Sequence, residues 1–151
     1  MEFDTALDRL RYCLDEACPK EFGWPDRVAA SIAAALELSA STPTVMRALT
    51  IDVFDHGLSG ALRYRRVVAH YSEHLAEGRA YGPSGAELPP VTEEALIGAV
   101  VGSIAEAMQT GREKSLPSRA AELAEFVLTP YLGAGEAKRV AARRVAHLAA
   151  A

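Results

Sequence analysis

The chain has 151 residues, of which half are hydrophobic and 24% are charged, and its formal net charge is -4. This length suits a single domain, residues 1–151, with one core. The acidic balance argues against nonspecific phosphate binding, so we expect no nucleic-acid partner for this chain alone. No uncharged run approaches the ~20 residues of a membrane span, and no signal-peptide pattern opens the chain. We expect a cytoplasmic protein with no membrane partner.

The first third of the chain shows helical periodicity. Apolar residues recur at spacings of four and three through residues 3–18, and Pro19 stops that helix. The next predicted helix, 25–40, opens with Pro25 at its first position and Asp26 at the positive end of its dipole. The inward stripes of the two helices contain Phe3, Leu7, Leu10, Leu14 and Ala17, and Val28, Ile32, Ala35, Leu36 and Ser39.

Two further helices are predicted over 43–51 and 58–77, with the segment 52–57 ambiguous. The second carries His70 and His74 one turn apart, a spacing that could place two imidazoles on one metal ion. The helical wheel places both with arginines, away from Leu58, Leu62, Val68 and Leu75, and HYSEH lacks the HExxH pattern of zinc hydrolases. We therefore favour solvated histidines and expect no metal or other cofactor.

A loop rich in glycine and proline leads to a predicted helix over 92–112, whose first turn Thr92 can cap. This helix has two apolar stripes. The large-residue stripe contains Ile97, Val101, Ile104 and Met108, and the small-residue stripe contains Ala95, Gly98, Gly102 and Ala105. One core needs an apolar face about 100° wide, so the second stripe needs another partner.

The following helix, 117–132, is also widely apolar and ends in FVLTPYLG, where Pro130 terminates the helix and Gly133 takes a left-handed cap. The basic run 138–144 in the C-terminal helical tail, 133–151, is interpreted as exposed and frayed. Two adjacent helices with surplus apolar surface predict a four-helix bundle between two identical chains. The predicted dimer interface consists of Ala95, Gly98, Gly102, Ala105, Ala121, Ala124, Leu128 and Tyr131.

The first four helices are expected to enclose a largely apolar cavity, closed on one side by the helix over 92–112. For Trp24, Tyr64 and Tyr71, plain packing remains the alternative to ligand contact. The predicted ligand-binding residues are Leu10, Leu14, Trp24, Val28, Ile32, Leu36, Met46, Tyr64, Val68, Tyr71, Ile104 and Met108.

Three segments also carry a family resemblance: WPDRV at 24–28, an LP followed by the TEEALIGAVVGSI helix, and a last helix ending in VLTPYLGAGEA. Over about Phe3 to Ala137 the chain resembles the C-terminal ligand-sensing and dimerisation domain of TetR-family transcriptional regulators. The resemblance implies an antiparallel, all-α bundle of about six to seven helices, a homodimer and a small-molecule pocket. That family places a helix-turn-helix before this point, whereas here Met1 leads directly into the first sensor helix. We therefore expect DNA contact only through an N-terminal module absent from this chain.

The leading hypothesis is thus a homodimeric domain of a transcription regulator that binds a small hydrophobic or aromatic effector. Two alternatives remain, a stand-alone helical adaptor and a small all-α enzyme. The sequence shows no glycine-rich phosphate loop and no nucleophile elbow, so we expect no enzyme.

Overall fold

The computed structural model describes residues 1–82 and 87–150, with side chains of the last helix described as far as Arg144. Within these ranges the chain contains helices and no strand, which confirms the all-α class. The α-helices are α1 (Phe3–Ala17), α2 (Trp24–Ser41), α3 (Pro43–Thr50), α4 (Gly57–Ala76), α5 (Thr92–Gln109), α6 (Ala120–Leu132) and α7 (Ala134–Ala150). Short 3-10 helices lie between some of them, namely η1 (Asp52–His56), η2 (Glu77–Ala80) and η4 (Glu113–Arg119).

The predicted helices are all present, with ends shifted by up to three residues. The ambiguous segment 52–57 is η1 and the start of α4. The predicted start at 117 falls inside η4, and the α-helix begins only at Ala120. Thr92 does not cap the backbone donors of α5, because its hydroxyl donates instead to the carbonyl oxygen of Pro89 at 2.7 Å.

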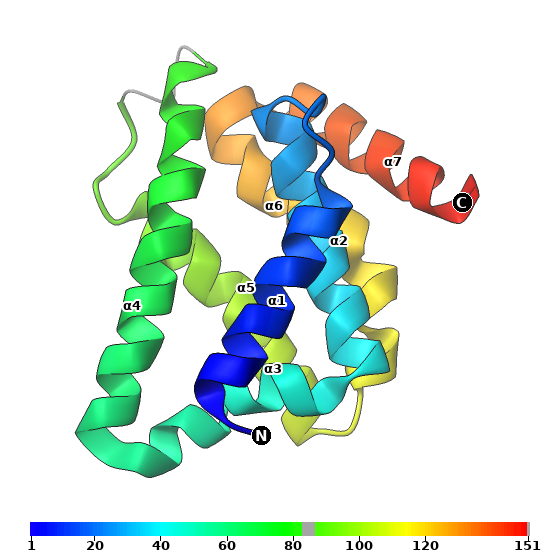
Figure 1. Ribbon diagram of the computed structural model, residues 1–151. Coiled ribbons are helices and arrows are strands. Elements are labelled where there is room, and N and C mark those ends of the chain that lie inside the picture. The colour runs from blue at the N-terminus through cyan, green and yellow to red at the C-terminus, as the bar shows by residue number, and fades with distance from the viewer. Residues whose placement is uncertain (83–86, 151) are drawn as a thin grey trace.

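Helix α2 lies at the centre of the bundle and packs against α1, α6, α7 and η4 (Figure 1). Its buried residues come from one broad face, which includes Ala29, Ile32 and Leu36. Helix α3 runs beneath and contributes Val45 and Met46 to the same core. No single helix among the described residues is long and apolar enough to cross a membrane; α2 and α3 reach that length only together, and they are bent by 109° where they meet.

The C-terminal segment is a docked helix, which corrects the interpretation of residues 138–144 as a frayed tail. Ala137, Val140 and Ala141 of α7 are buried against α6 and α2. Ion pairs also attach α7 to α2, since Asp26 in the first turn of α2 lies 2.8 Å from Arg143 and 3.1 Å from Arg144. The run is therefore part of the fold.

The segment FVLTPYLG forms the end of α6 and the bend that leads into α7. Helix α6 continues through Pro130 to Leu132, and Gly133 then adopts φ 82° and ψ 159°. This backbone region is open essentially to glycine alone. The glycine N–H donates to the carbonyl oxygen of Thr129, closing α6 just before α7 begins. Proline and glycine thus form a bend between two packed helices, and Gly133 does not have the αL geometry expected of a cap.

Helix α4 stands apart from the other helices on one side of the bundle (Figure 1). It packs mainly against η1 and α5, and only Gly60 and Leu75 are buried along its length. Leu58 and Leu62, which the helical wheel placed inward, are 77% and 48% exposed. The predicted inward face of α4 is therefore wrong. The residues of α4 that face α1 are Arg63, Val67 and their neighbours.

Candidate functional site: a cationic cleft between α1 and α4

An open cleft of about 380 Å³ separates the N-terminal helix from α4. This volume lies within the range of ligand pockets in proteins, about 300–1,000 Å³. Side chains from two helices line it, four from α1 and five from α4: Phe3, Asp4, Leu7, Arg11, Arg63, Arg66, Val67, His70 and Tyr71. A smaller hollow of about 260 Å³ adjoins it and shares Phe3 and Arg63.

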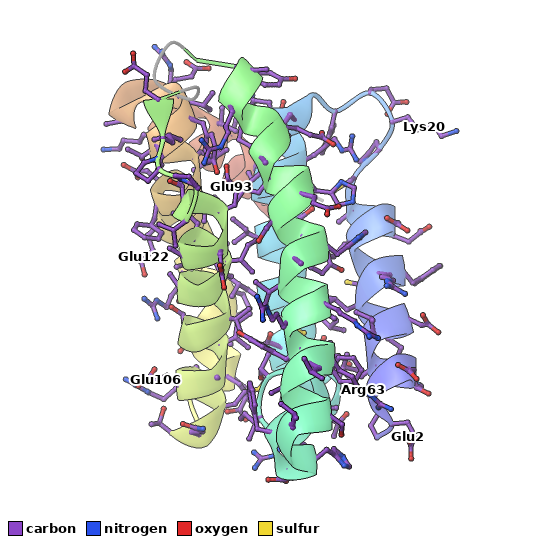
Figure 2. All side chains as sticks on the ribbon, turned by 90° about the vertical axis from the view of Figure 1, so that its left-hand side faces the viewer. Glu2, Lys20, Arg63, Glu93, Glu106 and Glu122 are labelled. Atoms are coloured by element: carbon purple, nitrogen blue, oxygen red, sulfur yellow. The ribbon has the colours of Figure 1, made fainter. Side chains whose placement is uncertain are left out.

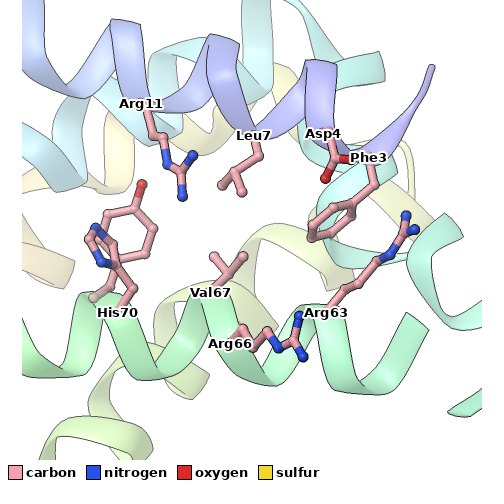
Figure 3. Close-up of a pocket in the computed structure, with 9 residues that line it drawn as sticks. Phe3, Asp4, Leu7, Arg11, Arg63, Arg66, Val67 and His70 are labelled. Atoms are coloured by element: carbon pink, nitrogen blue, oxygen red, sulfur yellow. The ribbon is translucent and has the colours of Figure 1, made fainter. Parts of the chain in front are cut away.

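The cleft has an apolar waist between polar ends (Figure 3). Leu7 from α1 and Val67 from α4 face each other across the middle. Arg11 and His70 lie at one end, and Phe3 and Arg63 lie at the other. Since these residues recur every three or four positions on their helices, each set forms one stripe that faces the opposite helix.

Tyr71 joins the end that holds Arg11 and His70. Its ring lies 5.2 Å from the His70 ring, and its hydroxyl oxygen is covered from solvent. No described residue exchanges a hydrogen bond with this hydroxyl. Burial raises the pKa of Tyr71, the positive charge of Arg11 lowers it in part, and the negative charge of Asp15 also raises it. The hydroxyl is thus a neutral donor beside a cation.

The arginines of the cleft are weakly paired. The contact of Arg11 with Asp8 is long, 3.6 Å, and both side chains are at least half exposed. No carboxylate of the described residues lies within salt-bridge distance of Arg63 or Arg66. The Arg63 guanidinium instead lies 6.0 Å from the centre of the Phe3 ring. The cleft therefore carries unneutralised positive charge beside apolar surface.

Most of the predicted ligand-binding residues occupy the core rather than this cleft. Tyr71 alone lines it. Tyr64 packs on Phe54 with ring centres 5.0 Å apart, and Val68 is half-buried on α4. The other nine are buried in the core or packed against it: Leu10, Leu14, Trp24, Val28, Ile32, Leu36, Met46, Ile104 and Met108. These side chains fill the space where α1, α2, α3 and α5 converge. The cleft therefore lies beside the predicted cavity, between α1 and α4.

The two histidines of α4 have different surroundings. His70 lines the cleft, whereas His74 lies 3.7 Å from Glu77 on an exposed turn. Their rings lie edge to face with centres 4.7 Å apart. Among the residues that the structure describes, no group of three His, Cys, Asp or Glu side chains could hold a metal ion. His70 therefore belongs with the arginines of the cleft.

The predicted dimer residues divide into an outward and an inward set. Ala95, Gly98 and Gly102 are exposed on α5, and Ala105 and Ala121 are half-buried. Figure 2 shows Glu106 of α5 and Glu122 of α6 projecting from the same side of the molecule. Ala124, Leu128 and Tyr131 are buried within the chain itself, where they leave no surface for a second copy. The outward surface is therefore the small-residue stripe of α5.

A buried polar cluster holds the far end of α4 in place. The Glu93 carboxylate accepts hydrogen bonds from Arg79 at 2.7 and 2.9 Å and from the Tyr131 hydroxyl at 3.1 Å. The Trp24 ring packs on Tyr131 and its Nε1–H donates to the carbonyl oxygen of His74. This cluster joins α2, α4, α5 and α6.

The sequence pattern puts Arg63, Arg66 and His70 on a solvated side of α4 and does not mark Arg11 as a site residue. A signal was present on α1, where the apolar stripe through Phe3 and Leu7 is continued four residues on by Arg11. The facing stripe on α4 was hidden, because Leu58 and Leu62 are the strongest apolar residues at its start. Which face of α4 turns inward is decided by η1 and α5.

The comparison with known proteins gives no relative for the chain. No family model, no curated protein and no solved structure matches it at a significant level.

Proposed function

We propose that this chain is the effector-binding and homodimerisation domain of a TetR-type transcriptional regulator, and that its effector is a mostly apolar small molecule. DNA would be contacted through a separate helix-turn-helix module. The observation that carries the proposal is the cleft between α1 and α4, a ligand-sized hollow lined by Leu7, Val67 and Tyr71, whose hydroxyl has no hydrogen-bond partner among the described residues.

The position of the cleft suits a sensor. Helix α4 is held at one end by Gly60 against η1, where a side chain would overlap the carbonyl of Val53. At its other end Gly78 lies against the Trp24 ring. Between these ends α4 faces α1 across the cleft, so a ligand there contacts two helices at once. Binding that favours one spacing of the two helices shifts the population toward that spacing.

The second support is the outward stripe of α5. Ala95, Gly98 and Gly102 are exposed, and no atom outside the helix backbone lies within 4 Å of a Cβ built at either glycine. Glycine in a helix interior costs about 1 kcal/mol relative to alanine. Close approach of another helix offsets that cost, and a second copy of the same stripe provides such a helix across a twofold axis.

Light scattering combined with a thermal-shift screen tests both halves of the proposal. We expect a dimer at micromolar concentration and at least one apolar or aromatic compound that raises the melting temperature. At a hundredfold excess over Kd the gain is about 2.7 kcal/mol. A monomer whose melting temperature no compound changes would rule out the sensor function.

A specific observation also supports the helical adaptor. Phe54 of η1 and Leu58 and Leu62 of α4 are large apolar residues that are about half exposed or more. Exposed apolar surface that is contiguous is typical of protein-docking sites. Replacing Leu58 and Leu62 with glutamate should leave ligand binding unchanged if the chain is a sensor, because neither side chain lines the cleft.

A further inference from the structure

The cleft between α1 and α4 has a charge opposite to that of the whole chain. Three arginines and one histidine line it, against the single carboxylate of Asp4. The chain as a whole has a formal net charge of -4. A local positive field on an acidic protein attracts small anions to that place and repels cations.

The arginines come from both walls and are spread along the cleft, with Arg11 at one end and Arg63 at the other. Arg11 descends from α1 toward the end where His70 lies on α4 (Figure 3). The Tyr71 ring neighbours His70, and its hydroxyl has no partner among the described residues. Arg11 is exposed and its pairing with Asp8 is long, so it can turn to a ligand without breaking a buried bond. An anion at this end would receive charge-assisted hydrogen bonds, about twice as strong as neutral ones.

The middle of the cleft suits an apolar body. Leu7 and Val67 flank the middle, and the Phe3 ring lies toward the other end. Residues 3 and 11 are eight positions apart, which corresponds to about 12 Å along a helix. An elongated apolar group of about this length would reach from the anion site to Phe3. An apolar cation would match only the apolar middle of the cleft, and an inorganic anion would match only its arginines.

We infer that the cleft between α1 and α4 binds an anion carried on an apolar body, a carboxylate or phosphate monoester, with its charged group between Arg11, His70 and Tyr71. This inference deepens the proposed sensor function and rests on it. It selects one class of ligand from the apolar compounds that the proposed function allows.

Titration calorimetry of the full chain with four ten-carbon probes separates charge from apolarity. The probes are decanoate, decyl phosphate, decanamide and decyltrimethylammonium, used below their aggregation concentrations, with acetate and inorganic phosphate as head-group controls. We expect both anionic probes to bind about tenfold or more tightly than decanamide, as a charge-assisted hydrogen bond predicts. The cation and the two head groups alone should not bind measurably. Comparing decanoate with decyl phosphate identifies which anion the site prefers.

Matched variants on the same helices locate the site. Arg11→Gln should weaken decanoate binding about tenfold, whereas Arg66→Gln, which lines the cleft outside the proposed anion site, should weaken it by a smaller factor. Arg9→Gln and Arg65→Gln remove the same charge from neighbouring exposed positions that do not line the cleft, so they should change it less than twofold. Equal losses in all four variants would mean that net charge, not this cleft, attracts the probe, and would overturn the inference.

Tyr71→Phe separates a role in ligand binding from a role in stability, because the melting temperature and the decanoate affinity can be measured independently. Removing a buried hydroxyl without a partner should leave the melting temperature of the free protein unchanged or raise it. The same variant should weaken decanoate binding severalfold while leaving decanamide unaffected. Loss of stability without loss of binding would show that the hydroxyl serves the fold, and would remove Tyr71 from the site.

The outcomes also separate this inference from the proposed function. If decanamide binds as tightly as decanoate and both compete for one site, the sensor function stands and the anion class is wrong. If none of the four probes binds while a neutral compound from the wider screen does, the anion class is again overturned. If neither the probes nor the screen yields a ligand, both proposals fail together.

Discussion

Glu93 is a charged residue whose side chain the fold buries almost completely, with 5% of the residue exposed. A buried carboxylate is costly unless it is neutralised and hydrogen-bonded. Arg79 supplies both requirements through two nitrogens, and Tyr131 supplies a third hydrogen bond. Arg79 itself is tied to the carbonyl oxygens of Leu88 and Pro89, so the same arginine fixes the end of the long loop.

Removing the arginine should therefore cost more than neutralising the acid. Arg79→Met leaves Glu93 buried without a counter-charge, which costs about 3 kcal/mol, or roughly 6–12 °C in melting temperature for a chain of this length. Glu93→Gln keeps an acceptor and leaves a partly exposed arginine, so about 1–2 kcal/mol is expected. Arg112→Met, which breaks the exposed pair with Glu106, is the control and should cost under about 1 kcal/mol. Equal losses for Arg79→Met and Arg112→Met would contradict this account.

The same cluster predicts how stability depends on pH. Hydrogen bonds from Arg79 hold the pKa of Glu93 below its ordinary value, despite the opposing effect of burial. The resulting stability is present above the unfolded pKa of about 4.3 and is lost as the pH falls through the folded value. Burial and the charge of Glu93 raise the pKa of Tyr131, so stability is also lost as the pH rises above about 10.

Thermal unfolding across pH should show both losses. Glu93→Gln should flatten the acid limb and also weaken the alkaline limb, because the charge of Glu93 helps to raise the pKa of Tyr131. Tyr131→Phe should remove the contribution of Tyr131 to the alkaline limb and reduce the acid limb only slightly, because Arg79 still holds the pKa of Glu93 low. If the acid limb keeps its full slope in Glu93→Gln, other carboxylates control acid unfolding.

At the scale of elements, the glycines of α4 and α5 have opposite surroundings. Gly60 of α4 lies so close to the Val53 carbonyl that an added Cβ would overlap it. Gly98 and Gly102 of α5 face open space in the single chain. Alanine at either α5 position should thus stabilise an isolated monomer by about 1 kcal/mol, because it restricts the unfolded chain and favours the helix.

In a dimer that packs through this stripe the sign should reverse. Gly98→Ala would hold two closely packed helices apart, so it should lower the melting temperature at high protein concentration and raise it at high dilution. Gly60→Ala, which clashes within the monomer, should destabilise the chain at both concentrations. A stabilising effect of Gly98→Ala that does not depend on concentration would exclude the α5 stripe as the interface.

The helices differ in how much of their packing the sequence could reveal. In α1 the periodic stripe Leu7, Leu10 and Leu14 predicts the inward face, because a single face is covered by α2 and α3. In α4 only Gly60 and Leu75 are buried, so apolar residues carry little information about its orientation. Arg79 and Glu93 are 14 residues apart in the sequence, and no local pattern encodes such a contact. The candidate site therefore needed the structure, whereas the order of helices did not.

For the whole molecule, a dimer predicts that stability depends on concentration. The melting temperature of the wild-type chain should rise as the protein is concentrated, since association removes folded monomer from the unfolding equilibrium. Ala95→Glu places a charge in the stripe of α5 and should abolish that rise. Leu58→Glu is the matched control on the other exposed apolar surface, and it should leave the concentration dependence intact. A wild-type melting temperature that is independent of concentration would argue for a monomer.

The chain contains a single tryptophan, and its place in the fold has an optical consequence. Trp24 is buried at the junction where Gly78 and Tyr81 meet α2 and α6, with the Tyr81 ring tilted against its ring and the Tyr131 ring meeting it edge-on. Its indole N–H donates to the last turn of α4 through the carbonyl oxygen of His74. Emission from this one fluorophore therefore reports on the attachment of α4, and a red shift will register the release of that helix end without any added label.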